Sequence, residues 1–184
     1  MKKIIIAALL STFVAAPAVA SDFYAGIKLG TVDYGYFYLR NNNQTGFGML
    51  GGYIFNDNFA MEIEFMDLGG FDTPTRVYSG SVLSLNAVST YQLTEAFSLS
   101  GKFGIANTTL DATAQPGATT PLVNKTSFSK NALTAGLRGQ YDLTSTVGIY
   151  AAMDSYAVDA IYGGGSDSTT SVATVSSVGG MFKF

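Results

Sequence analysis

The chain has 184 residues, of which 47% are hydrophobic, and it contains neither cysteine nor histidine. Its net charge of -3 argues against a nucleic-acid partner, because nucleic-acid binding requires a basic surface. The missing residue types exclude disulfide scaffolds, Ser-His-acid and Cys-His catalysis, and histidine metal sites, so we expect no catalytic residues, no metal, no cofactor and no enzymatic activity.

The first 20 residues have the three parts of an export signal. Lys2 and Lys3 form a basic start, an apolar run follows, and Ala18-Val19-Ala20 fits a small-residue cleavage site before Ser21. The apolar run is too short to span a membrane as a helix, and Pro17 closes it. We therefore predict a cleaved signal peptide over residues 1–20 and one exported domain over residues 21–184.

Strict alternation of apolar and other residues is clearest over residues 59–68, where Glu62 and Glu64 lie between Met61, Ile63 and Phe65. A period of two predicts a strand with two different faces. Similar alternation predicts eight strands in all, at about residues 22–30, 45–55, 59–68, 78–91, 96–106, 131–141, 147–156 and 170–184.

The connections between these strands alternate between short turns and long polar loops, the long ones being residues 31–44, 69–77, 107–130 and 157–169. This parity is typical of an up-and-down barrel with both termini in the periplasm, and a Greek-key sandwich would not keep it. The sequence therefore predicts an all-β fold, an eight-stranded antiparallel up-and-down transmembrane β-barrel. The alternative is an exported soluble barrel that binds an apolar ligand, with its charged face outward.

In the transmembrane barrel, the apolar face of each strand points to lipid and the polar face points to the lumen. The predicted lumen charges are Lys28, Glu62, Glu64, Lys102, Arg138 and Asp154. A one-residue slip of register would turn all six into lipid, at a cost on the order of 10 kcal/mol, so the register is well specified.

An eight-stranded barrel has just enough internal width for side chains, so we do not expect an open pore. Counting residues from the short turns places Arg138 near Glu62, and Glu64 near Lys102 or Lys28. We predict a buried ion-pair network of these residues, because buried charges need partners. The alternative is that trapped water solvates them.

Three segments carry a resemblance to a known family: FYAGIKLG at residues 23–30, GMLGGYIFNDNFAMEIEFMDLGG at residues 48–70, and the ending SSVGGMFKF. Together they resemble small OmpA-like outer-membrane β-barrel proteins of Gram-negative bacteria, without that family's peptidoglycan-binding domain. The resemblance implies a location in the cell outer membrane, among its lipids and lipopolysaccharide. It also implies that the terminal Phe184, with Phe182 on the same face, is the signal that the barrel-assembly machinery recognises during insertion.

The first long loop contains four aromatic residues, Tyr34, Tyr36, Phe37 and Tyr38. Exposed aromatic residues can anchor a binding partner, but an extension of the flanking strands above the membrane explains them better. We expect a monomer with a structural or surface-interaction role. The alternatives are an adhesin or receptor that binds a host or cell-surface ligand through its loops, and a narrow porin-like channel.

Gly46 to Gly51 spell the dinucleotide-binding pattern G-x-G-x-x-G, but a strand continues after them where that site requires a helix. Small inward glycines that leave room for lumen side chains explain the pattern better. Ser127 to Lys130 match S-x-x-K without its companion motifs, so we assign them no catalytic role.

Overall fold

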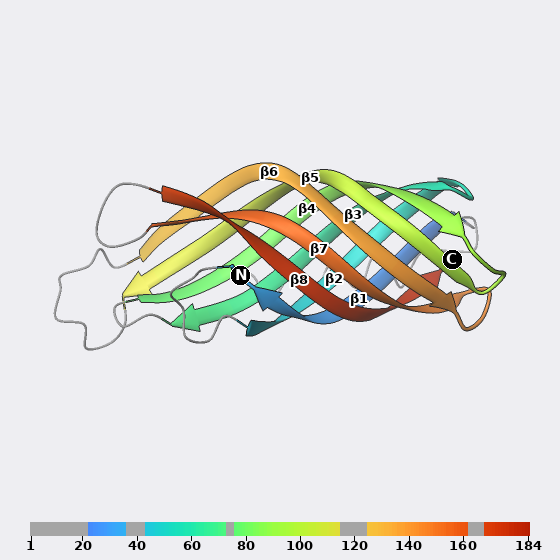
Figure 1. Cartoon of the computed structure of the whole chain (residues 1–184), viewed down its shortest axis with the longest axis horizontal. Helices are drawn as coiled ribbons and strands as arrows, with labels where there is room; N and C mark the ends of the chain where they lie inside the picture. The colour runs from blue at the N-terminus through green and yellow to red at the C-terminus, as the bar shows by residue number, and fades with distance from the viewer. Residues whose placement is uncertain (1–21, 36–42, 73–75, 115–124, 162–167) are drawn as a thin grey trace.

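The computed structural model describes residues 22–35, 43–72, 76–114, 125–161 and 168–184. They form eight strands that close into one barrel (Figure 1). The strands are β1 (Phe23–Asp33), β2 (Asn43–Asn56), β3 (Phe59–Asp72), β4 (Arg76–Gln92), β5 (Phe97–Ala114), β6 (Lys125–Asp142), β7 (Val147–Ile161) and β8 (Ser168–Lys183).

Each strand pairs antiparallel with the next one in the sequence, and β8 pairs with β1 to close the barrel. The predicted fold class is therefore confirmed. The short turns lie at one end, where the Lys183 amide donates to the Thr146 carbonyl at 2.8 Å, so the C-terminus lies at this same end (Figure 1). We call it the turn end and the opposite end the loop end. Among the described residues, no helix is long and apolar enough to cross a membrane.

The two faces of the strands point as the alternation predicted. Apolar side chains on the outer wall are exposed, for example Ile27 at 57%, Phe103 at 58% and Leu137 at 70%. Exposure of this kind in so many large apolar residues is expected where lipid, and not water, surrounds the wall.

The strands extend further toward the loop end than predicted. Residues 107–130 were expected to form a loop, but β5 continues to Ala114 and β6 already begins at Lys125. In this part the polarity is reversed: Asn107 points outward and is exposed, while Leu110 and Ala112 point inward and are buried. The predicted β5 and β6 were too short because the prediction required apolar residues on the outer face of every strand.

Side chains fill the lumen in three layers along its axis. The turn-end layer is apolar and contains Tyr24, Leu50, Ala60, Val88, Tyr150, Ala152 and Met181. The loop-end layer is larger and contains Val32, Tyr34, Met66, Leu68, Tyr78, Val82, Ala106, Leu110, Ala112, Tyr156, Val158, Ala173 and Val175. The charged residues of the lumen lie between these two layers.

Glycines on the inner wall make room for this filling, as predicted for Gly46 and Gly48 of β2, whereas Gly51 of the same pattern faces outward, where it pairs with Ala25 and Ile63. A Cβ at Gly52 would overlap the Tyr24 ring, and one at Gly48 would lie 2.7 Å from the Met66 sulfur and 3.0 Å from Lys28 Cε. These positions face large lumen side chains, so a larger residue there would force those side chains to move.

Candidate functional site: a charged network in the lumen

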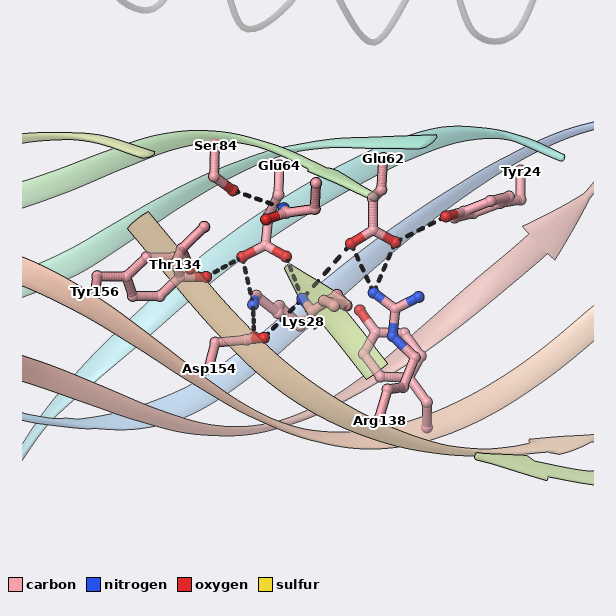
Figure 2. Close-up of polar contacts among 12 residues, drawn as sticks. Tyr24, Lys28, Glu62, Glu64, Ser84, Thr134, Arg138, Asp154 and Tyr156 are labelled. Atoms are coloured by element: carbon pink, nitrogen blue, oxygen red, sulfur yellow. Dashed lines mark hydrogen bonds and ion pairs between the residues drawn. The ribbon is translucent and has the colours of Figure 1, made fainter. Parts of the chain in front are cut away.

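Five strands supply the six charged side chains of the lumen. Lys28 comes from β1, Glu62 and Glu64 from β3, Lys102 from β5, Arg138 from β6 and Asp154 from β7. Each occupies an inward position of its strand, and none of the six is more than 5% exposed. Figure 2 shows Glu62 and Glu64 facing Arg138 and Asp154 across the lumen, with Lys28 beside Glu64 and Asp154.

One part of the group is centred on Arg138 and Glu62. The Nη2 atom of Arg138 donates to both carboxylate oxygens of Glu62, at 2.8 and 2.7 Å. The hydroxyl of Tyr24 donates to Glu62 Oε2 at 3.0 Å, and the guanidinium lies over the Tyr150 ring, 4.9 Å from its centroid. The carboxylate therefore has both a charged and a neutral donor, which a buried anion needs.

The other part is a closed ring of alternating charge. Lys28 Nζ lies 2.6 Å from Glu64 Oε1 and 2.7 Å from Asp154 Oδ2. Lys102 Nζ lies 2.9 Å from Glu64 Oε2 and 2.7 Å from Asp154 Oδ1. Each ammonium thus bridges the same two carboxylates.

The two parts are connected through Lys102, whose Nζ also lies 3.5 Å from Glu62 Oε1. The hydroxyl of Tyr156 donates to Glu64 Oε1 at 2.5 Å (Figure 2). Three cations and three anions sum to zero charge, so the group as a whole carries no uncompensated charge into the lumen.

The sequence predicted the six charges, a contact of Arg138 with Glu62, and a contact of Glu64 with Lys102 or Lys28. In the structure Glu64 contacts both lysines. The bridging position of Asp154 and the hydroxyl donors Tyr24 and Tyr156 were not predicted. Both tyrosines share the inward parity of Lys28 and Asp154 on their own strands, and this parity was the available signal.

Two buried polar atoms next to the network have no hydrogen-bond partner among the described residues: Arg138 Nε and Ser177 Oγ. The register places both residues beside Ala152, which pairs with Arg138 on one side and with Ser177 on the other. Hydrogen bonding at this level of the lumen is therefore less complete than in the ring of ion pairs around Lys28 and Lys102.

A pocket of about 430 Å³ occupies the turn end of the lumen, where residues of the turn-end layer line it together with polar side chains. Its lining includes Asn58, Gln92, Ser100, Gln140 and Arg138. Because Arg138 also contacts Glu62, the pocket and the charged network meet at this side chain.

Tyr34 was considered as a possible loop contact, with an extension of the flanking strands as the favoured explanation. Its side chain is fully buried in the loop-end layer, where the hydroxyl donates to the Leu68 carbonyl at 3.1 Å. The next residue, Gly35, has a φ of 61°, a left-handed conformation that favours glycine. Tyr36, Phe37 and Tyr38 lie outside the described residues, as does the predicted signal peptide over residues 1–20.

The two aromatic residues of the predicted assembly signal lie on the outer wall at the turn end. Phe182 and Phe184 are 45% and 38% exposed, and their ring centroids are 5.0 Å apart in an edge-on arrangement. The amide of Phe184 donates to the Phe23 carbonyl at 2.9 Å, which connects the chain end to β1.

Comparisons with known proteins agree on one architecture. The sequence profile of the family described as "Outer membrane protein beta-barrel domain" matches residues 5–182. No curated protein matches the sequence closely enough to be reported.

Three solved structures illustrate the shared fold. Neisserial surface protein A has a TM-score of 0.65 and 11% identity over 88% of this chain and 97% of its own. The outer membrane protein OprG from Pseudomonas aeruginosa has a TM-score of 0.60 and 17% identity over 90% and 96%. Ail, the attachment invasion locus protein of Yersinia pestis, has a TM-score of 0.58 and 18% identity over 89% and 97%. At these identities the likeness concerns the fold alone.

Proposed function

The chain belongs to the outer membrane protein β-barrel domain family, and from this premise we propose that it is a closed barrel with a structural or surface-interaction role. The observation that carries the proposal is the filling of the lumen between the turn-end pocket and the loop end. The charged network, whose members are at most 5% exposed, lies between two apolar layers. An ion on a path through the lumen would have to displace both the apolar side chains and the paired charges.

The outer wall supports placement in a lipid bilayer. At the turn end, the rings of Phe23 and Tyr53 are 4.9 Å apart, those of Tyr53 and Phe55 also 4.9 Å, and those of Phe55 and Phe59 5.7 Å. Such a cluster suits the membrane–water interface, where aromatic girdles flank the apolar band of outer-membrane barrels. In this proposal the barrel is an exported monomer, inserted by the assembly machinery, whose loop end faces the lipopolysaccharide side.

Conductance across a planar lipid bilayer tests the closed lumen. The refolded wild-type barrel is expected to give no steady channel, because its lumen is filled. Arg138→Ala is expected to produce channel openings, because it removes the largest cation of the network and leaves Glu62 with weaker partners. Ser177→Ala is the control, because Ser177 Oγ has no hydrogen-bond partner among the described residues and lies at the same level. A steady wild-type channel that Arg138→Ala leaves unchanged would refute the closed lumen.

A second candidate function, surface attachment, is favoured by the outer wall at the loop end. Here β5 and β6 present an exposed polar ladder. Asn107 Nδ2 donates to Asn131 Oδ1 at 2.6 Å and to Ser129 Oγ at 3.0 Å, and Ser127 Oγ donates to Asp111 Oδ1 at 2.7 Å. Such a ladder offers hydroxyls and amides to a polar partner above the membrane.

Attachment of outer-membrane vesicles to cultured host cells tests this candidate. Vesicles that carry the wild-type barrel are compared with vesicles that carry the triple variant Asn107→Ala, Asp111→Ala and Ser129→Ala. If the ladder binds the host surface, the triple variant loses the attachment that the wild type adds over empty vesicles. Equal attachment by both barrels would remove this candidate.

A further inference from the structure

A groove of about 490 Å³ crosses the outer wall of the barrel, on the side where β8, β1, β2 and β3 run next to one another. Apolar residues line it, among them Ile27, Phe47, Met49, Ile63, Phe65 and Phe182. Its volume falls in the range of about 300–1,000 Å³ that is usual for small-ligand pockets.

Small residues at three outward positions create the groove. In one row across the wall, Phe182 pairs with Ala25, Ala25 with Gly51, and Gly51 with Ile63. In the next row, Gly180 pairs with Ile27. Large side chains therefore stand around a floor formed by Ala25, Gly51 and Gly180.

The packing of the barrel does not require a glycine at position 180. A Cβ there would meet only the Gly148 carbonyl oxygen, at 4.0 Å. Its neighbour Gly179 is different, because a Cβ at that inward position would overlap the Ile27 carbonyl and lie 2.5 Å from the Tyr150 ring. The inner glycine makes room for the lumen filling, whereas Gly180 only leaves the outer groove open.

We propose that this groove binds one acyl chain of a phospholipid from the leaflet at the turn end. The groove lies within the apolar band and adjoins the aromatic cluster, since Ala25 follows Phe23 by two residues and Gly51 precedes Tyr53 by two. A chain in the groove would thus have its glycerol and headgroup beside Tyr53, at the depth where aromatic girdles meet lipid headgroups.

The shape of the groove favours a lipid chain over a second copy of the barrel. Two barrels meet through convex walls of fixed shape, which fill a groove between side-chain ridges less completely than a flexible chain does. Apolar surfaces gain nothing in a bilayer from leaving water, so association there depends on close van der Waals packing. A flexible hydrocarbon chain restores the contacts that an unfilled groove would lose.

Photo-crosslinking in vesicles tests the proposal. The mature chain is refolded into vesicles of phosphatidylethanolamine and phosphatidylglycerol that contain a phosphatidylethanolamine with a diazirine in one acyl chain. After irradiation, mass spectrometry maps the crosslinked residues on the wild type, on Gly180→Leu and Ala25→Leu, which fill the groove, and on Gly101→Leu. Gly101 is the matched control, because it lies on β5, across the barrel, and its Cβ would meet nothing within 4 Å.

In the wild type, crosslinks are expected to concentrate on Ile27, Met49 and Phe182. Each groove-filling variant should reduce these crosslinks by about fivefold or more, which corresponds to about 1 kcal/mol of binding free energy. The control Gly101→Leu should leave them unchanged. Heat-modifiable gel migration verifies that every variant has folded. Crosslinks spread evenly around the wall, or unchanged in folded Gly180→Leu and Ala25→Leu, would overturn the proposal. So would a wild-type dimer in detergent that these two variants dissociate, since the occupant would then be a second barrel.

Discussion

Met66 and Asp67 are consecutive residues of β3, yet Met66 is completely buried in the lumen and Asp67 is exposed on the outer wall. One step earlier the polarity is the opposite, since Glu64 is buried in the lumen and Phe65 faces outward. At this level the outer face of β3 therefore changes from apolar to charged, and the inner face changes from charged to apolar. A bilayer on the turn-end side of this level and water on the loop-end side account for the exchange.

We predict that the bilayer surface crosses β3 between Phe65 and Asp67. Single cysteines at Ile63, Phe65 and Asp67 of the refolded barrel, which has no native cysteine, report the depth. A membrane-impermeant maleimide should label Asp67→Cys readily and Ile63→Cys poorly, because thiolate formation and the reagent both need water. Equal labelling at all three positions would contradict this boundary.

The pair of Arg138 and Glu62 should be strongly coupled. Arg138→Met leaves a buried carboxylate with weaker partners, and we expect it to lower the free energy of unfolding by about 3–5 kcal/mol. The double variant Glu62→Met and Arg138→Met should lose less than the sum of the two single variants, because it leaves neither charge alone. Urea unfolding of the vesicle-embedded barrel, followed by tyrosine fluorescence, gives the three values.

The control for this cycle is the ion pair of Lys183 and Asp142 at the turn end, with an N–O distance of 2.8 Å and side chains that are 30% and 17% exposed. Because water screens it, Lys183→Met should cost about 1 kcal/mol or less. If breaking either ion pair lowers the free energy of unfolding by the same amount, then burial does not strengthen the interaction of Arg138 with Glu62.

Inward and outward glycines of β5 should respond oppositely to alanine. A Cβ at Gly104 would overlap the Leu85 carbonyl and lie 2.7 Å from Asn86 Cα, so Gly104→Ala should destabilise the barrel by about 1–3 kcal/mol. Gly101→Ala has open space and should stabilise it by about 0.5–1 kcal/mol, because alanine loses less backbone entropy. Urea midpoints of the two variants measure the difference, and two shifts of the same sign would refute it.

Removal of the Ser177 hydroxyl should be harmless. Its Oγ is buried without a hydrogen-bond partner among the described residues, so Ser177→Ala loses no hydrogen bond and removes a group that is costly to bury. We expect a change between zero and about 1 kcal/mol of added stability in urea unfolding. A clear loss of stability would mean that the hydroxyl has a partner that supports the fold.

Phe184 should matter for assembly more than for stability. It is 38% exposed, and its side chain packs edge-on against Phe182 alone among the described aromatic residues. Phe184→Ser should therefore reduce the amount of folded barrel in the outer membrane of expressing cells, while the purified variant refolds into vesicles with nearly unchanged urea stability. Unreduced membrane levels of Phe184→Ser would remove its role as the assembly signal.

The sequence by itself determined the fold class and the direction of every charged side chain in the lumen. Alternation has a period of two, and a bilayer penalises charge on one face only, so a single register satisfies the segment from Phe59 to Phe65. The same alternation assigned Gly46 and Gly48 to the inner wall, where they lie against the side chain of Met66.

Only the tertiary structure decided which side chains meet across the lumen and how far the strands extend. Lys28 and Asp154 are far apart in the sequence. The stagger between strands that closes the barrel places Lys28 Nζ 2.7 Å from Asp154 Oδ2. The buried positions of Tyr34 and Leu110 depend on the reversed polarity above the membrane. There the alternation continues with its two faces exchanged, because water replaces lipid outside and apolar side chains fill the space inside.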